Sequence, residues 1–267
     1  MRATCEDFVA EGLSLASVMG GLRDADFRTG TAFQGWTLDD VLVHLHLWNG
    51  LARQALTDPS AVRGFIGRWM ATTTPGDRRA LENAEVGPRG VALLDAWKSG
   101  VEELGMEWKE LDPRRRVTWA GPEMSLRTAL TARLMETWAH GQAVFDVLGI
   151  ERPERDSVRH VALLGAQTYG WSFAVHGARP PGPMPAVRLT LPSGATLDLG
   201  GDPTSGLVEG AAVEFAQVVA QTRNVEDTAL QVTDGAARRW MAVAQCFAGP
   251  PAVPPPPGTR FRRGCTP

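Results

Sequence analysis

Residues 132–142 read ARLMETWAHGQ and carry a glutamate and a histidine four positions apart, Glu136 and His140. Apolar residues recur through this segment at helical spacing, so the two side chains leave one helix face about a turn apart. A carboxylate and an imidazole in that arrangement can bind one metal ion. Two ligands make a poor site, so a third ligand has to come from another segment.

Residues 35–46, GWTLDDVLVHLH, supply that third ligand. Thr37 and Asp40 form the pattern of a helix-starting capping box, and His44 lies on the apolar stripe of the helix that follows. We predict that His44, Glu136 and His140 form a metal centre inside a helical bundle, with a coordination position left open for chemistry. Zinc accepts these ligands in catalytic sites, and nickel, iron(II) and manganese accept them too.

The same residues could be solvated or satisfied core side chains without any ion. Their place on apolar stripes favours a metal, because an unpaired buried carboxylate is costly and a cation offsets that cost. His46 is two residues from His44 and faces roughly the other side of the helix, so we expect a supporting or structural role for it. His160 and His176 are typical of packing or surface residues.

The composition is that of an ordinary globular protein. The 267 residues are 43% hydrophobic and 21% charged, and 27 basic against 30 acidic side chains give a net charge of -3. That balance argues against a nucleic-acid or anionic-membrane partner and favours a small-molecule substrate. The three cysteines, Cys5, Cys246 and Cys265, form no CxxC pair, and neither a signal-peptide pattern nor a long apolar segment is present. We therefore expect a cytoplasmic protein.

Helical spacing dominates the first two thirds of the chain. Helices are predicted at 5–22, 37–56, 60–72, 88–111, 125–149 and 157–177, with polar residues 73–87 as an exposed loop. Long helices with short connections indicate a bundle, which we place at 1–178. The proline-rich residues 178–185 then mark a domain boundary.

A small α/β domain is predicted at 186–249. Residues 187–191 and 195–199 alternate at period two around a Pro-Ser-Gly turn, which indicates a hairpin. A helix at 208–223, a strand at 229–232 and a helix at 236–247 follow. Residues 250–267 are proline-rich and predict a flexible tail. The fold class is therefore α+β.

The two ligand segments, 35–45 and 132–142, resemble those of the DinB-like, mycothiol-dependent maleylpyruvate isomerase family of actinobacteria. Residues 159–162, 170–175 and 247–251 resemble later landmarks of an uncharacterised branch of that family. The similarity spans nearly the whole chain. It implies a DinB-like four-helix bundle that holds the metal and a smaller C-terminal domain of sterol-carrier type.

The resemblance also implies a chemistry. In this family a metal activates a thiol, commonly mycothiol, for attack on an electrophile. In the isomerase the thiolate adds to the cis double bond of maleylpyruvate, the bond rotates, and elimination returns the trans isomer. The expected function is therefore a metal-dependent isomerase or thiol transferase, with zinc and mycothiol as cofactors. A thiol-independent hydrolase, lyase or cyclase and a non-enzymatic metal or small-molecule binding protein are the alternatives.

Three positions depart from the family pattern. Relatives usually carry charged residues where this chain has Asn49, Ala143 and Tyr169. We hypothesise that the centre acts on a less polar substrate, with the thiol cofactor abandoned.

Other residues could take part, and each has a structural alternative. Arg223 could reach a substrate carboxylate or merely complement a helix C-terminus. Trp48, Trp138 and Trp171 could line a pocket or pack in the core. An exposed bundle face could support a homodimer.

Overall fold

The computed structural model describes residues 1–120 and 123–264. The contacts of the chain divide it into two compact units, Met1–Val147 and Leu148–Pro267. Residues 148–178, which the sequence assigns to the bundle, belong by their contacts to the second unit. Cys265 lies outside the described residues, and Cys5 and Cys246 are buried free thiols.

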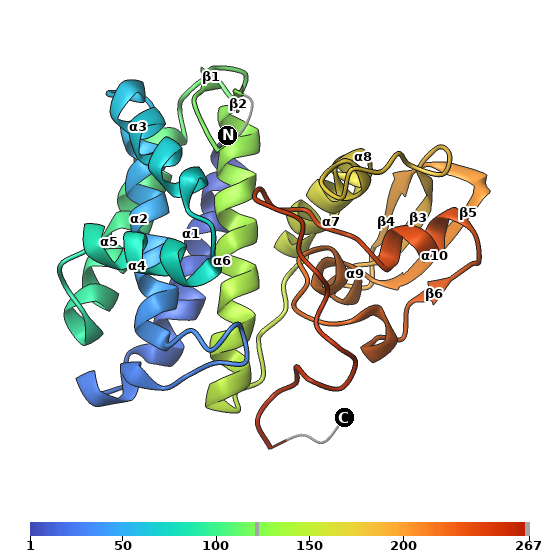
Figure 1. Cartoon of the computed structure of the whole chain (residues 1–267). Coiled ribbons are helices and arrows are strands. Elements are labelled where there is room, and N and C mark those ends of the chain that lie inside the picture. Colours follow the sequence, from blue (N-terminus) through green and yellow to red (C-terminus); the bar gives the residue numbers. More distant parts are fainter. Residues whose placement is uncertain (121–122, 265–267) are drawn as a thin grey trace. The chain divides into compact units, whose positions relative to one another are not determined.

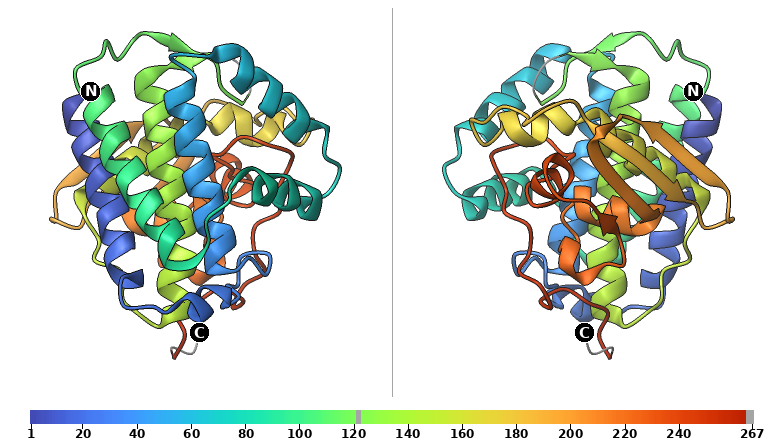
Figure 2. Two further views of the ribbon diagram at one scale, coloured as in Figure 1. Left: turned by 90° about the vertical axis from the view of Figure 1, so that its left-hand side faces the viewer. Right: turned by 90° about the vertical axis from the view of Figure 1, so that its right-hand side faces the viewer.

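Four long helices run side by side in the first unit (Figures 1 and 2). They are α1 (Arg2–Met19), α2 (Leu38–Gln54), α5 (Gly90–Trp108) and α6 (Leu126–Leu148). Fully buried side chains such as Phe8, Trp97 and Trp108 fill the space between them. A Cβ at Gly12 would lie 2.7 Å from Cγ1 of Val101, so a glycine lets α1 and α5 approach closely.

The two helices that carry the candidate ligands begin at the predicted caps. Thr37 Oγ1 accepts a hydrogen bond from the backbone N–H of Asp40 at 3.1 Å, and the Asp40 carboxylate accepts one from the Thr37 N–H at 2.9 Å. Ser125 Oγ accepts a hydrogen bond from the backbone N–H of Thr128 at 3.1 Å. Local sequence therefore determines where α2 and α6 start.

Two shorter helices, α3 (Pro59–Ala71) and α4 (Pro75–Glu85), lie between α2 and α5 in the chain. The predicted loop at 73–87 is wrong, because most of it forms α4. Thr74 caps α4, Pro75 occupies its first turn, and among its described residues Glu82 alone is buried. A helix whose inward residue is a carboxylate shows no apolar stripe, which is why periodicity missed it.

The remaining elements of the first unit are short. They are η1 (Asp24–Arg28), β1 (Arg116–Val117) and β2 (Met124–Ser125), of which the two strands pair antiparallel.

The second unit opens with short helices. They are η2 (Asp156–Val158), α7 (Arg159–Gln167) and α8 (Tyr169–Ala174). The sequence predicts one continuous helix here, but the chain breaks at Thr168, which is not helical. A Cβ at Gly165 would lie 2.7 Å from Cγ2 of Val219, so α7 packs closely on α9 (Ala212–Val219). That packing ties α7 to the second unit.

A four-stranded sheet in the order β4-β3-β5-β6 completes this unit. Its elements are β3 (Pro185–Thr190), β4 (Thr196–Gly200), β5 (Asp202–Ala211) and β6 (Gln231–Val232), with η3 (Val225–Asp227) and α10 (Ala236–Met241). The predicted hairpin is confirmed, because β3 and β4 pair antiparallel around Gly194. The helix predicted from Val208 begins only at Ala212, because Val208 pairs with Val187 in the sheet.

The proline-rich segment makes hydrogen bonds with the η3 region of the second unit. Asn224 Nδ2 donates to the carbonyl oxygen of Pro255, and the Gly258 N–H donates to the Asp227 carboxylate, both at 2.8 Å. These bonds join the proline-rich segment to the rest of the second unit.

The α+β fold class is confirmed, with an N-terminal helical bundle and a C-terminal α/β part. Within residues 1–120 and 123–264, every helix is too short or too polar to cross a membrane.

Candidate metal centre

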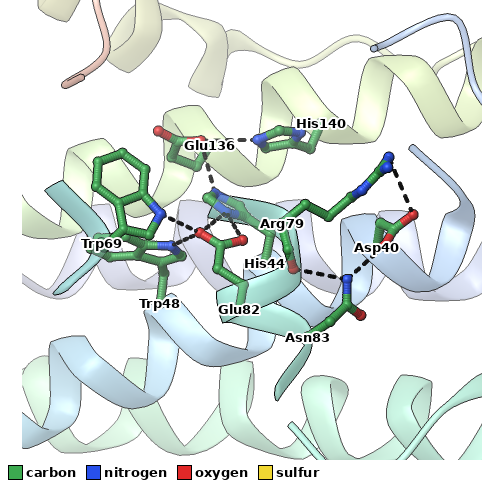
Figure 3. Close-up of polar contacts among 9 residues, drawn as sticks. All are labelled: Asp40, His44, Trp48, Trp69, Arg79, Glu82, Asn83, Glu136 and His140. Atoms are coloured by element: carbon green, nitrogen blue, oxygen red, sulfur yellow. Dashed lines mark hydrogen bonds and ion pairs between the residues drawn. The ribbon is translucent and has the colours of Figure 1, made fainter. Parts of the chain in front are cut away.

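The three predicted ligands come together in the first unit. Oε2 of Glu136 lies 3.2 Å from Nε2 of His140 and 3.4 Å from Nε2 of His44 (Figure 3). One ligand atom from each residue lies within 4.8 Å of those of the other two. His44 comes from α2 and the other two from α6, so two capped helices build the cluster.

Aromatic rings enclose the two imidazoles. Trp36 stacks on His140 with a centroid distance of 5.2 Å and an interplanar angle of 8°, and Phe33 meets the same ring edge-on at 4.9 Å. Trp36 also contacts His44 at 5.5 Å. These contacts orient both rings and keep water from their faces.

A second carboxylate, Glu82 of α4, lies behind His44. It accepts hydrogen bonds from Nδ1 of His44 at 3.0 Å and from the indole nitrogens of Trp48 and Trp69, each at 2.9 Å (Figure 3). An ionised carboxylate has no proton to donate, so Nδ1 of His44 carries the hydrogen. Nε2 is then the nitrogen turned toward Glu136.

The pKa shifts show that this cluster attracts positive charge. Burial lowers the pKa of His44, but the carboxylates of Glu82 and Glu136 outweigh it and raise that pKa from 6.5 to about 9. Burial would raise the pKa of Glu136, yet its contacts with His140 and His44 hold it well below the usual range. The pKa of His140 is lowered by burial. The carboxylates thus stay charged and favour a cation beside His44.

A buried arginine adds a fixed positive charge. Arg133 of α6 is 2% exposed, and its Nε donates to Oδ1 of Asn49 at 3.0 Å. Within the described part of the chain, Nη2 of Arg133 and Nδ2 of Asn49 have no hydrogen-bond partner. Burial lowers the pKa of Arg133 to about 10, and the charges of Glu136 and Glu82 oppose that shift. The guanidinium therefore stays charged at neutral pH, next to the candidate ligands.

The donor set fits a divalent ion. Ligands about 2.1 Å from zinc lie about 3.4 Å apart in a tetrahedron, and the two distances to Glu136 are close to that value. Nε2 of His44 is buried and has no hydrogen bond among the described residues, although it faces a carboxylate oxygen. Two facing lone pairs repel each other, so a cation or a proton must lie between them. A divalent ion would meet that need.

The family is identified by a family model, the mycothiol maleylpyruvate isomerase N-terminal domain, which matches residues 8–145. The chain belongs to this family. The match ends two residues before the first structural unit does, so it covers nearly all of the helical bundle and all three candidate ligands.

Individual relatives agree with this assignment. Two uncharacterized proteins of Mycobacterium tuberculosis, from strains CDC 1551 and H37Rv, are each 34% identical over 248 residues, or 92% of this chain and 95% of theirs. The crystal structure of the mycothiol-dependent maleylpyruvate isomerase matches with a TM-score of 0.54 at 15% identity, over 87% of this chain and 92% of that one. The crystal structure of a mutant of that isomerase matches with a TM-score of 0.53 at 16% identity, over 86% of this chain and 91% of that one. These two structures support the fold.

Other candidate residues lie apart from the cluster. His46 is half-buried on α2 and lines a cavity of about 420 Å³ with Glu85 and Val86, and burial lowers its pKa. Arg223 follows α9 in the second unit, where Nη1 donates to the carbonyl oxygen of Thr222. His160 is half-buried and His176 exposed.

The tryptophans and the unusual positions have separate surroundings. Trp48 belongs to the Glu82 cluster, Trp138 is buried, and Trp171 is 40% exposed and donates to the carbonyl oxygen of Phe247. Tyr169 donates to the carbonyl oxygen of Gly182, and Ala143 is half-buried on α6. Tyr169 thus supplies a local structural bond within the second unit.

Sequence reasoning missed Glu82, Trp69 and Arg133. The Thr74-Pro75 pair is a helix-start signal that could have revealed α4. Arg133 precedes Glu136 by three residues and so shares its helix face, which could have indicated a charge beside the ligands. No local signal marks Glu82 itself as buried.

Proposed function

We propose that this chain is a metal-dependent enzyme of the thiol-dependent isomerase or thiol-transferase type. His44, Glu136 and His140 would hold a divalent ion, with zinc as the default for two imidazoles and a carboxylate. The observation that carries the proposal is the convergence of the three side chains: one ligand atom from each lies within 4.8 Å of the others, and the buried Nε2 of His44 faces the Glu136 carboxylate at 3.4 Å. A divalent ion between them would complete the ligand set.

The charges of the site suit an anionic ligand. Glu82 and Glu136 with the Arg133 guanidinium sum to one negative charge, so a divalent ion would leave the centre one charge positive. When bound, the ion would supply Lewis acidity that lowers the pKa of a thiol or polarises a carbonyl. Trp36 and Phe33 cover one imidazole and exclude water from that side. The net positive charge would favour a bound thiolate over a thiol, whereas the apolar cover by itself would not.

Mycothiol is the proposed thiol and a small electrophile the proposed substrate. The support is membership of a family whose model is named for mycothiol and maleylpyruvate, together with a fold that matches the isomerase of that name. The M. tuberculosis relatives, uncharacterized themselves, add no reaction.

A second candidate keeps the ion but uses no thiol, as in a hydrolase, lyase or cyclase. It is favoured by the neutral residues at three positions where relatives carry charge. Asn49, whose Oδ1 accepts a hydrogen bond from Nε of Arg133, is neutral and therefore offers no charge to a polar cofactor. A less polar substrate would suit such a site.

Elemental analysis of the purified protein tests the proposal, beside the variants His44→Ala and Glu136→Ala. We expect one ion per chain in the parent and none in either variant, followed by metal-dependent binding of mycothiol in calorimetric titration. Isomerisation of maleylpyruvate or thiol transfer to an electrophile panel would then identify the reaction.

The other outcomes separate the alternatives. An ion with turnover but without mycothiol binding would favour the thiol-independent enzyme. An ion without turnover of any electrophile would favour a binding protein. Absence of the ion from the parent would overturn the metal centre.

A further inference from the structure

We propose that Glu82 is a positioning residue that fixes the orientation of His44 toward the ion, and that metal binding and the docking of α4 therefore stabilise each other. This inference rests on the metal centre proposed above. Glu82 comes from α4, a helix that holds none of the three candidate ligands.

Glu82 determines the hydrogen bonding of His44. Glu82 is 3% exposed, and both of its oxygens lie within hydrogen-bond distance of Nδ1, at 3.0 and 3.2 Å. Because a carboxylate only accepts, this contact favours the tautomer with its proton on Nδ1. That tautomer presents an unprotonated Nε2 to the ion, as ligation through Nε2 requires.

Two tryptophans hold the Glu82 carboxylate in place. Trp48 of α2 and Trp69 of α3 both donate to Oε1, and their rings meet edge to face at 5.5 Å. Arg78 lies over the Trp69 ring at 5.0 Å. Two indole donors on one oxygen leave the other oxygen directed at His44. The tryptophans thus set the angle at which Glu82 meets the imidazole.

The helix α4 has few other buried contacts with the bundle. Glu82 is the sole buried side chain among the described residues of α4, and the helix has only 11 residues. Helices that short are marginal in water without tertiary contacts. The other link to α2 is polar and part-buried: Asn83 Nδ2 donates to Asp40 at 2.8 Å, with Arg79 4.0 Å from the same residue. The Glu82 cluster is therefore the main anchor of α4.

These contacts link metal binding and the docking of α4 in both directions. A cation on Nε2 polarises the imidazole and strengthens the bond from Nδ1–H to Glu82. By thermodynamic linkage, the free energy by which the ion stabilises the docked α4 equals the free energy by which the docked helix strengthens metal binding.

The test compares Glu82→Gln with Glu85→Gln. Glutamine at position 82 keeps the shape but presents an amide N–H₂ or a neutral oxygen to Nδ1. Glu85 is three residues further on, exposed and paired with Arg68, so its variant makes the same chemical change on the same helix. The zinc dissociation constant of each metal-free protein is measured by competition with a chromophoric chelator. We expect Glu82→Gln to weaken zinc binding about 10- to 100-fold and Glu85→Gln to remain near the parent.

Amide hydrogen exchange supplies the second readout. Residues 75–85 of the parent should exchange more slowly with zinc than without it, and this difference should shrink in Glu82→Gln. Trp69→Phe removes one donor to Glu82 but keeps an aromatic ring. It should weaken zinc binding by a smaller factor, so the proposal stays testable if Glu82→Gln fails to fold.

Glu82 would have a merely structural role if Glu82→Gln lowered the stability of the metal-free protein but bound zinc as tightly as the parent. Amide exchange rates in α4 that are the same with and without zinc would also overturn the coupling. If the parent bound no zinc, or Glu136→Ala bound it equally well, the metal centre itself would be wrong. Zinc binding that requires Glu136 but not Glu82 would overturn only this inference.

Discussion

The helices α6 and α4 each bring one buried or half-buried carboxylate to His44, but they do so by different means. α6 has 23 residues, most of them buried, whereas among the described residues of α4 only Glu82 is buried. Glu136 is thus carried by a helix that packs regardless of the metal centre. Glu82 is carried by a helix that, in our proposal, docks mainly through the contacts of Glu82 with His44, Trp48 and Trp69. The difference predicts that substitutions in α6 and in α4 have different effects on metal binding and on stability.

The largest effect is expected on the α6 side. His140→Ala should abolish metal binding and leave the fold intact, because α6 keeps its apolar contacts when one ligand is removed. Elemental analysis measures the ion, and circular dichroism with thermal unfolding of the metal-free protein measures the fold. His46→Ala, on α2 but outside the cluster, is the control and should retain the ion. Full metal content in His140→Ala would mean that the ligand set is wrong.

An intermediate effect is expected from Asn49→Asp. The new carboxylate would face Nε of Arg133, which now bonds to Oδ1 of Asn49 at 3.0 Å. It would neutralise the buried guanidinium, so an anionic ligand should bind about tenfold more weakly to the metal-loaded protein. Calorimetric titration with mycothiol measures this change. Gln54→Glu, an equivalent change at an exposed position on α2, is the control. Unchanged thiol affinity would show that the charge of Arg133 does not act on the ligand.

The smallest effect is expected from removing matched caps on the two helices. Thr74 Oγ1 accepts from the N–H of Asp77 at 3.1 Å, as Ser125 Oγ accepts from that of Thr128 at the same distance. Ser125→Ala should lower global stability by about 1 kcal/mol, since α6 is part of the core. Thr74→Ala should instead speed amide exchange in α4 with little change in global unfolding. Denaturant unfolding and hydrogen exchange distinguish the two. Equal losses of global stability would mean that α4 folds together with the bundle.

The sequence by itself determined the parts of this protein that depend on neighbours in the chain. The caps at Thr37 and Ser125, the hairpin around Gly194 and the one-turn spacing of Glu136 and His140 are local patterns, and the structure contains each of them. The choice of His44 as the third candidate ligand also follows from local sequence, because the apolar stripe of α2 points His44 inward.

Only the tertiary structure decided which polar side chains are buried. Glu82 looks like a surface residue of a polar segment until His44, Trp48 and Trp69 surround it. Arg133 is buried with a hydrogen bond to Asn49, which is 84 residues away in the chain. Val208 is a further example: the sequence pattern predicts a helix there, but the residue lies in β5, where it pairs with Val187 of β3. Burial and long-range hydrogen bonds depend on contacts between residues that are distant in sequence. The periodicity of apolar residues along the chain therefore cannot predict them.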